Sequence, residues 1–287
     1  MLRAAVAGPA HSAPLSLQHR VDAATKTVAH AAAGLARPAS PPPSAAAPAA
    51  LDTAQPAILT LKESDAGALD RASVCFGRSM QTDPTMTYAT GGRCPQRVAA
   101  LFTQVAAMCM RGARDRATTW LLETPGQQPS GGSDSADSVC IACEYPSAYP
   151  SDWELLRAGL LRVLLACPGW GAVRALLSLL SQFETAKAQF KKENHTFLYI
   201  ACYGTAPELQ GRGLGSQLMQ RVLQHADAKN LPVYLEASSA ASAAFYRRHG
   251  FLDIKQVRAD PGAPDIYIMA RPRAAQQQGQ EGPQGPQ

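Results

Sequence analysis

The chain has 287 residues, of which 46% are hydrophobic, so it can bury a sizeable apolar core. Its net charge of +5 comes from 27 basic and 22 acidic residues that are spread along the sequence, and this mild balance does not predict nucleic-acid binding. The seven cysteines are irregularly spaced, which argues against a disulfide framework and favours a reducing compartment.

The two ends of the chain have the composition of disordered tails. Residues 1–56 are dominated by Ala, Pro and Ser and cannot bury enough apolar surface to offset the entropy lost on ordering. Their only acidic residues are Asp22 and Asp52, and arginine-bearing, acid-poor N-termini are also typical of organelle transit peptides. The segment therefore predicts either a chloroplast or mitochondrial address or an untargeted tail on a cytoplasmic protein. Residues 274–287, rich in Gln, Gly and Pro, predict a second loose tail.

Between the tails, residues 57–273 show the periodic segments and turn residues of one folded domain. The predicted elements are, in chain order, a strand at Ile58–Leu61, a helix from Ala66, a helix at Cys94–Arg111, strands at Thr118–Glu123 and Val139–Tyr145, a helical pair at Asp152–Lys192 and a strand at Thr196–Thr205. Residues 124–138 contain Gly, Ser, Pro and Asp without periodicity and predict a flexible insertion between two of these strands.

The longest apolar region, Leu155–Leu180, lies inside the predicted helical pair. Arginines, glycines and Pro168 interrupt it, so it falls short of the ~20 continuous apolar residues that a membrane-spanning helix needs. We therefore expect two packed helices and no membrane partner. Cys140 and Cys143 stand three positions apart without a second pair at zinc-binding spacing, so we also expect no metal site.

A glycine-rich loop follows the strand at Thr196–Thr205. It reads Gln210-Gly211-Arg212-Gly213-Leu214-Gly215-Ser216 and runs into an amphipathic helix that closes before Pro232. Glycines in the first turn of a helix let the backbone approach a ligand closely and leave the first N–H groups bare. Because the helix dipole adds partial positive charge there, the loop predicts an anion site suited to the pyrophosphate of a nucleotide cofactor, with Arg212 at its rim.

Other glycine-rich motifs match this loop less well. A P-loop would end in Gly-Lys-Ser or Gly-Lys-Thr, which the segment lacks. A dinucleotide-binding fingerprint would open the first β-α-β unit as G-x-G-x-x-G, whereas Gly211, Gly213 and Gly215 are two apart and late in the chain. The loop alone leaves open a glycine-rich helix start that binds no ligand.

Three motifs in order resemble those of the GNAT superfamily of acetyl-CoA-dependent N-acetyltransferases. They are Q-x-x-G-x-G at Gln210, Gly213 and Gly215, the strand Val233–Ser238 followed by F-Y-x-x-x-G-F within Ala244–Phe251, and the closing strand Ile266–Pro272 with its M-x-R-P ending. The last motif, together with Phe76, Asp83-Pro84 and Tyr88 earlier in the chain, is similar to a subgroup that includes antibiotic and other small-amine acetyltransferases. The resemblance implies an α/β (α+β) GNAT fold, in which helices flank a mixed twisted sheet of six to seven strands with a splayed parallel pair.

The resemblance also implies where acetyl-CoA binds. It would lie between the strands that end at Thr205 and Ala237, where an exposed strand edge bonds the pantetheine amides and the loop amides hold the pyrophosphate. The expected cofactor-binding residues are Tyr203, Gly204, Thr205, Gln210, Gly211, Arg212, Gly213, Leu214, Gly215, Ser216 and Ser242. Ser242 stands where relatives often carry asparagine.

Two residues are candidates for proton transfer. Direct attack of an amine on a thioester benefits from an acid near the departing thiolate, and Tyr246 aligns with the family's tyrosine acid; the alternative is a core aromatic beside Phe245. Glu236 stands where some relatives carry a base; the alternative is a solvated or salt-bridged carboxylate.

The leading hypothesis is a transferase that moves the acetyl group of acetyl-CoA to a small primary amine by direct attack. We expect a monomer or homodimer without nucleic-acid, membrane or metal partners. Two alternatives stay open: a non-catalytic acyl-CoA-binding or regulatory module, and an acetyltransferase of protein lysines or N-termini.

Overall fold

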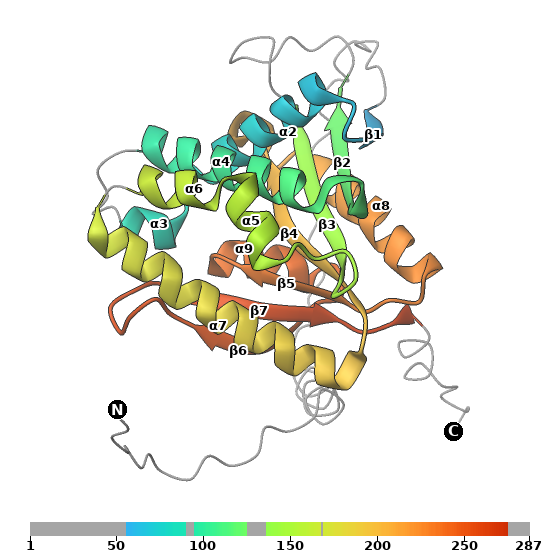
Figure 1. Cartoon of the computed structure of the whole chain (residues 1–287). Coiled ribbons are helices and arrows are strands. Elements are labelled where there is room, and N and C mark those ends of the chain that lie inside the picture. Colours follow the sequence, from blue (N-terminus) through green and yellow to red (C-terminus); the bar gives the residue numbers. More distant parts are fainter. Residues whose placement is uncertain (1–55, 90–94, 125–135, 168, 275–287) are drawn as a thin grey trace, which may run out of the picture. The chain divides into compact units, whose positions relative to one another are not determined.

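A seven-stranded mixed sheet lies at the centre of the structure, a computed structural model that describes residues 56–89, 95–124, 136–167 and 169–274 (Figure 1). All of these residues belong to one compact unit, Ala49–Gln287. The predicted N-terminal tail and transit peptide, most of the predicted insertion and almost all of the C-terminal tail lie outside the described residues.

The strands follow the sheet order β1-β2-β3-β4-β5-β7-β6. Their bounds are β1 Ala57–Leu61, β2 Ala117–Glu123, β3 Ser138–Tyr145, β4 Phe197–Thr205, β5 Val233–Ala237, β6 Leu252–Val257 and β7 Ile266–Arg271. Neighbouring strands are antiparallel except for β4 and β5, which are parallel. The predicted fold class, a mixed sheet of six to seven strands with one parallel pair, is therefore confirmed.

The helices lie in the connections between the strands. Their bounds are α2 Ala66–Ser79, α3 Pro84–Ala89, α4 Pro95–Ala113, α5 Asp152–Leu155, α6 Leu161–Ala166, α7 Trp170–Asn194, α8 Leu214–Ala228 and α9 Ala240–Arg247, with a π-helical turn at Leu156–Leu160 and 3-10 turns at Arg114–Arg116 and Pro207–Leu209. None of the helices in the described ranges is both long enough and apolar enough to cross a membrane.

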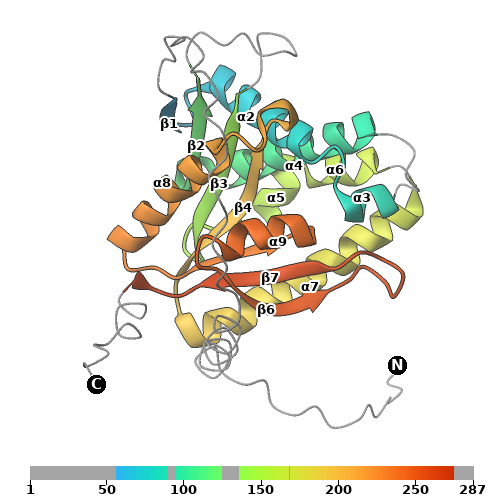
Figure 2. The same cartoon turned by 180° about the vertical axis from the view of Figure 1, so that it is seen from behind.

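The two faces of the sheet bury separate cores. On β2, Trp120 and Leu122 pack with residues of α8, whereas Leu121 between them packs with residues of α2 and α4, because successive strand side chains point to opposite faces. Helices α8 and α9 cover the first face, which we call the α8 face (Figure 2). Helices α2, α4 and α7 cover the other, which we call the α4 face (Figure 1).

Strands β4 and β5 pair only where they begin. Leu198 lies opposite Val233 and Tyr199 opposite Tyr234, and the pairing stops there. In the pairing of β3 with β4, the register shifts between Ile141 and Ala142, and such a bulge bends the strand locally. Beyond Tyr199, the edge of β4 that faces β5 therefore carries backbone groups without a strand partner.

Candidate active site

The glycine-rich loop lies at the end of β4, where β4 and β5 have parted. A 3-10 turn follows β4, and α8 begins at Leu214. Gly211 and Gly213 have φ angles of 78° and 83°, and a Cβ at either position would meet no atom within 4 Å. Glycine is therefore favoured at both positions because the backbone is left-handed there, and not because a side chain would lack space.

The main-chain amides of this loop are available to a ligand. Among the described residues, none of the N–H groups from Gly211 to Ser216 donates a hydrogen bond, and the first amide of α8 to do so is that of Gln217, to the Gly213 carbonyl at 3.0 Å. Unpaired donors at the positive end of a helix dipole attract anions. With the exposed side chain of Arg212 beside them, these amides fit a diphosphate group.

Side-chain contacts fix the loop against β4. The Tyr203 hydroxyl donates a hydrogen bond to the Gly215 carbonyl, and the Gln210 side-chain amide donates to the Thr205 carbonyl at 3.1 Å. A Cβ at Gly215 would lie 3.1 Å from Thr205 Oγ1, a tighter contact than most side chains make, so glycine favours the close approach of the helix start to the strand. Gln210 and Tyr203, two of the predicted cofactor-binding residues, thus also hold the loop in position against β4.

The other predicted cofactor residues have structural contacts of their own. A Cβ at Gly204 would lie 2.0 Å from Ser79 Oγ, so glycine lets α2 pack closely on β4. The Leu214 side chain is buried in the core of the α8 face. The Ser242 hydroxyl donates to the Ser239 carbonyl at 2.9 Å within the N-terminal capping box of α9. This cap accounts for a serine at position 242 without a ligand.

Tyr246 lies on α9, on the α8 face. Its side chain is 7% exposed, and its ring centroid is 6.0 Å from that of Tyr203 and 5.5 Å from that of Phe251. Burial raises the pKa of Tyr246, so the hydroxyl keeps its proton at physiological pH. A protonated hydroxyl beside the diverging end of β4 can act as a proton donor.

Glu236 lies on β5, on the α4 face. The Tyr199 hydroxyl donates to its Oε2 at 3.0 Å, whereas Oε1 is shielded from solvent and accepts no hydrogen bond of ordinary geometry in the described part of the chain. The Tyr234 hydroxyl, which is also unpartnered there, lies close enough to the carboxyl group to lower its pKa. Burial raises the pKa of Glu236 to about 7, although the charge of Lys187 and the hydrogen bond from Tyr199 act against the rise. A carboxyl group that titrates near neutrality can accept a proton at physiological pH.

Beside Glu236 lies a buried lysine that the sequence analysis missed. The Lys187 side chain, on α7, is 2% exposed, and its Nζ donates to Glu184 Oε1 at 2.7 Å and to the Tyr149 hydroxyl at 2.8 Å. The same nitrogen lies 4.3 Å from the ring centroid of Tyr149 and 4.4 Å from that of Tyr199. These residues come from separate parts of the sequence, so no local pattern could have connected them.

Asp83, directly before α3, is a second buried carboxylate near β5. It is 5% exposed, and its Oδ1 accepts the Met86 N–H at 2.8 Å. Burial raises the pKa of Asp83, while the Met86 amide, the Ser238 side chain and the Thr85 amide lower it. Because Ser238 directly follows β5, Asp83 lies at the end of the strand that carries Glu236. In the sequence, Asp83 belongs to a segment that resembles one of the GNAT family, and no role was predicted for it.

A family model described as the acetyltransferase (GNAT) family matches residues 185–251, which hold β4, the glycine-rich loop, α8, β5 and α9. This segment of the chain carries the sequence pattern of the GNAT superfamily. GNAT acetyltransferases use acetyl-CoA, which agrees with a diphosphate site at the loop. No cluster of three or more His, Cys, Asp or Glu residues that could hold a metal ion occurs in the ranges that the structure describes.

Several known proteins are similar to parts of this sequence or to its fold. An uncharacterised N-acetyltransferase of Schizosaccharomyces pombe is 30% identical over 110 residues, which are 37% of this chain and only 44% of that relative. Arylalkylamine N-acetyltransferase 2 from Aedes aegypti superposes on this chain with a TM-score of 0.52 at 14% sequence identity. The superposition covers 75% of this chain and 98% of the mosquito protein, so the two proteins share a fold. The polyamine N-acetyltransferase of Drosophila melanogaster gives a TM-score of 0.49 at 16% identity, over 75% and 99% of the two chains.

The predicted cofactor residues gather at the end of β4 and the start of α8, with Ser242 apart from them in the cap of α9. The two predicted proton-transfer residues lie on opposite faces of the sheet near the diverging strands. Their roles stay predictions.

Proposed function

We propose that this protein transfers the acetyl group of acetyl-CoA to a small primary amine by direct attack. The observation that carries the proposal is the array of free amides from Gly211 to Ser216 at the place where β4 and β5 part. These amides and Arg212 would hold the diphosphate, and the free edge of β4 at Tyr203–Thr205 would bond the pantetheine chain. Acetyl-CoA, when bound, supplies the activated acetyl thioester.

Two residues of the chain would move protons on opposite sides of the reacting atoms. Glu236 Oε1 has no hydrogen-bond partner within the described ranges, so it can take the proton that the attacking amine loses. The Tyr246 hydroxyl would give its proton to the departing sulfur. This pairing of a base on the α4 face with an acid on the α8 face requires no covalent enzyme intermediate.

Contacts on the α4 face support a small acceptor. The Tyr88 hydroxyl of α3 donates to Asp260 Oδ1 at 3.0 Å, and the Ser178 hydroxyl of α7 donates to the Ala259 carbonyl at 3.1 Å. Both bonds tie the connection between β6 and β7 to helices α3 and α7, and α7 covers the face that carries Glu236. An enclosed face of this kind suits a small molecule better than a folded protein substrate.

Buried Glu236 favours an enzyme over a non-catalytic acyl-CoA-binding module. A module that only binds the cofactor gains nothing from an acceptor-side carboxylate with a shielded, unpartnered oxygen, and such a group costs about 1–3 kcal/mol or more. A general base, by contrast, needs a free oxygen and a pKa near the working pH.

Cofactor binding can be tested by titrating CoA and acetyl-CoA into the protein. Gly213→Ala forces alanine into a left-handed conformation at a cost of about 1–2 kcal/mol, so we expect roughly tenfold weaker binding. Gly171→Ala is the matched control, because a Cβ there meets no atom within 4 Å and its place in α7 should leave CoA affinity unchanged. If wild-type protein binds no CoA thioester, the proposal fails.

Acetyl transfer can be followed in the same preparations by mass spectrometry with a panel of amines. Tyr246→Phe should lower kcat by roughly 100-fold or more while the Kd of acetyl-CoA changes little, because only proton donation is lost. Equal losses of kcat and affinity would mean that the ring serves packing alone.

A further inference from the structure

Two shielded side-chain oxygens at the start of α3 lack hydrogen-bond partners. Asp83 Oδ2 and Thr85 Oγ1 are closed to solvent and unpartnered among the residues that the structure describes, and the two residues are 5% and 3% exposed. Leaving such an atom unpaired costs about 1–3 kcal/mol, so each one calls for an explanation. Both oxygens can accept hydrogen bonds and one belongs to a carboxylate, so the partner that suits them is a cationic donor.

These oxygens lie close to the proposed reaction site. The Ser238 side chain lies close enough to the Asp83 carboxylate to lower its pKa, and Ser238 stands two residues after Glu236. Ser238 lies in a bend directly after the last residue of β5, so its Cα is at most about 7 Å from that of Glu236. Asp83 therefore lies beside the end of the strand that carries Glu236.

We propose that Asp83, Thr85 and Ser238 bind the second ammonium group of a diamine whose primary amine reacts at Glu236. The inference rests on the proposed function, since it names the class of acceptor that this site takes. An ammonium group has three N–H donors, and these side chains offer three oxygens: Asp83 Oδ2 and the hydroxyls of Thr85 and Ser238. The negative charge of Asp83 would offset the desolvation of the buried cation.

The two nearby basic side chains are each bonded to a carboxylate other than Asp83. Lys187 of α7 is bonded to Glu184 at 2.7 Å, and Arg258, which follows β6, is bonded to Asp265 at 2.5 Å. Asp260 accepts the hydrogen bond of Tyr88 of α3 and adds a further negative charge near this helix. A cationic ligand therefore meets carboxylates here, while these two basic side chains are engaged elsewhere.

Asp83→Asn is a suitable test because asparagine is also a favoured N-terminal cap and can still accept the Met86 N–H, while the charge is lost. Cadaverine and pentylamine form a matched pair of probes, since they have the same carbon chain and only cadaverine carries a second ammonium. Two quantities are measured: kcat/KM with acetyl-CoA, and equilibrium binding of each amine to the CoA-loaded protein by calorimetry.

In wild-type protein we expect cadaverine to be preferred by roughly 10- to 100-fold in both measurements. Asp83→Asn should bring that ratio near one, and Thr85→Val should lower it by a smaller factor. Asp70→Asn, at an exposed position of α2, is the control for a change of net charge and should leave the ratio as it is.

The possible outcomes separate this inference from the proposed function. A cadaverine-to-pentylamine ratio near one in wild-type protein would overturn the inference. Equal losses of kcat/KM for the two amines in Asp83→Asn would also overturn it, because they would place Asp83 at the reacting amine. If no amine is acetylated yet cadaverine binds and Asp83→Asn abolishes the binding, the transfer fails and the cation site stands. If cadaverine neither binds nor reacts, the cation site is wrong.

Discussion

Glu236 links the chemistry of the proposed site to the stability of the fold. Burial raises its pKa from 4.5 to about 7, with Glu184 adding to the rise, while Lys187 and the Tyr199 hydroxyl oppose it. Between these pH values the folded protein holds a proton that the unfolded chain has lost. The free energy of unfolding therefore falls as pH rises through this window, by up to about 3 kcal/mol, and becomes independent of this group above pH 7.

Glu236→Gln should remove both the stability window and the catalytic base. We expect the melting temperature of wild-type protein to fall more between pH 5 and 8 than that of the variant, and kcat/KM of the variant to be lower by about 10²- to 10⁴-fold. Wild-type kcat/KM should rise with pH and level off above about 7, the pKa of the base. The later rise from ionisation of the amine itself should persist in Glu236→Gln.

Parallel pH profiles of kcat/KM for the two proteins would contradict a base role. An identical pH dependence of their melting temperatures would instead show that Glu236 is not buried as a titrating group. The two measurements therefore check the catalytic and the structural consequence of the same carboxyl group separately.

At single positions, the sequence could indicate only residues that belong to a local motif. Gly213 and Gly215 lie within one turn of a helix, so their spacing predicted free amides, and the structure shows those amides without partners. Lys187 reaches Tyr149 and Tyr199 across 38 and 12 positions of the sequence. A contact of that kind follows from packing, and periodicity along the chain does not encode it.

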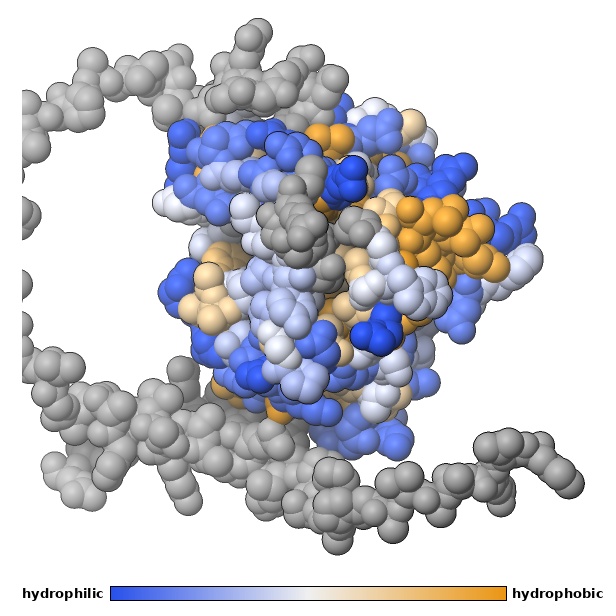
Figure 3. Space-filling view, turned by 90° about the vertical axis from the view of Figure 1, so that its left-hand side faces the viewer, coloured by the Kyte–Doolittle hydropathy of each residue, from blue (hydrophilic) through white to orange (hydrophobic). Residues whose placement is uncertain are grey.

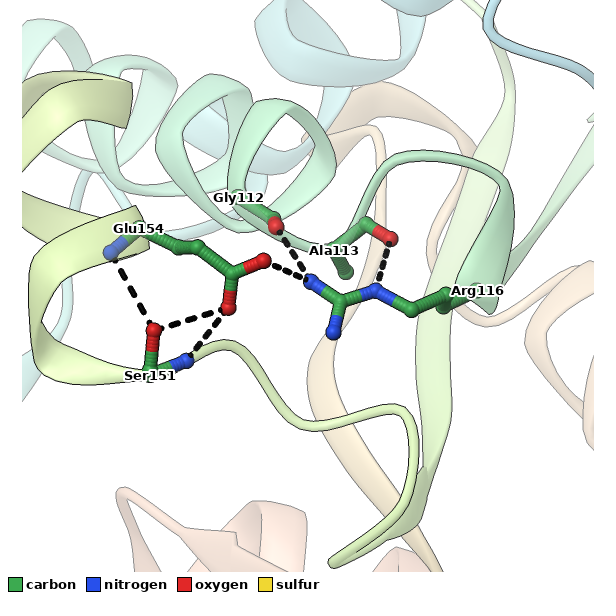
Figure 4. Close-up of polar contacts among 5 residues, drawn as sticks. All are labelled: Gly112, Ala113, Arg116, Ser151 and Glu154. Atoms are coloured by element: carbon green, nitrogen blue, oxygen red, sulfur yellow. Dashed lines mark hydrogen bonds and ion pairs between the residues drawn. The ribbon is translucent and has the colours of Figure 1, made fainter.

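At the scale of elements, Arg116 joins the end of α4 to the start of α5 (Figure 4). It donates to the carbonyls of Gly112 at 3.1 Å and Ala113 at 3.2 Å, and to Glu154 Oε1 at 2.6 Å. Glu154 Oε2 in turn accepts from the N–H of Ser151 at 2.8 Å and from its hydroxyl at 2.9 Å, which completes the capping box of α5. One side chain thus satisfies the last carbonyls of one helix and steadies the cap of the next.

Arg116→Met should lower the free energy of unfolding by about 1–2 kcal/mol, because two helix-end carbonyls lose their donor. Arg157→Met is the control, since Arg157 is exposed on the π-helical turn, and it should change stability by less than about 0.5 kcal/mol. Urea unfolding of the three proteins measures the difference. Equal effects of the two substitutions would show that Arg116 contributes only as a surface charge.

Two elements went unpredicted for physical reasons. The edge strand β6 has mostly exposed or half-exposed residues and a bulge between Asp253 and Lys255, so its sequence lacks a regular alternation. Helix α3 is only six residues long, too short for a helical period to show. Asp83-Pro84 was the available signal, because an acidic cap followed by proline is a typical helix start.

At the scale of the whole described unit, the sheet divides the proposed chemistry between its faces. The glycine-rich loop and Tyr246 meet the core of the α8 face, whereas Glu236 and Lys187 lie on the α4 face under α7. Helix α7 is held there by a narrow buried stripe and by hydrogen bonds such as that of Gln182 to the Arg258 carbonyl at 2.8 Å. The residues of the stripe are Ala172, Leu179, Lys187, Phe190 and Asn194.

The helical segment before β4 leaves apolar side chains on the surface, where Figure 3 shows an apolar patch. Leu165 of α6 is 76% exposed, whereas Leu179 of α7 is 4% exposed. The same substitution should therefore have unequal effects at the two positions. Leu165→Ala should change the free energy of unfolding by less than about 0.5 kcal/mol, and Leu179→Ala should lower it by about 2–4 kcal/mol through the lost burial and the cavity left behind.

Urea unfolding at a protein concentration low enough to exclude association gives both values. A loss at Leu165 that approaches the loss at Leu179 would mean that the exposed side of α6 is covered in the folded protein. A small loss at Leu179 would mean that α7 is only loosely held on the α4 face. Because α7 carries Lys187 and Glu184, loosening it should also move the pKa of Glu236, which the pH dependence of kcat/KM in Leu179→Ala would report.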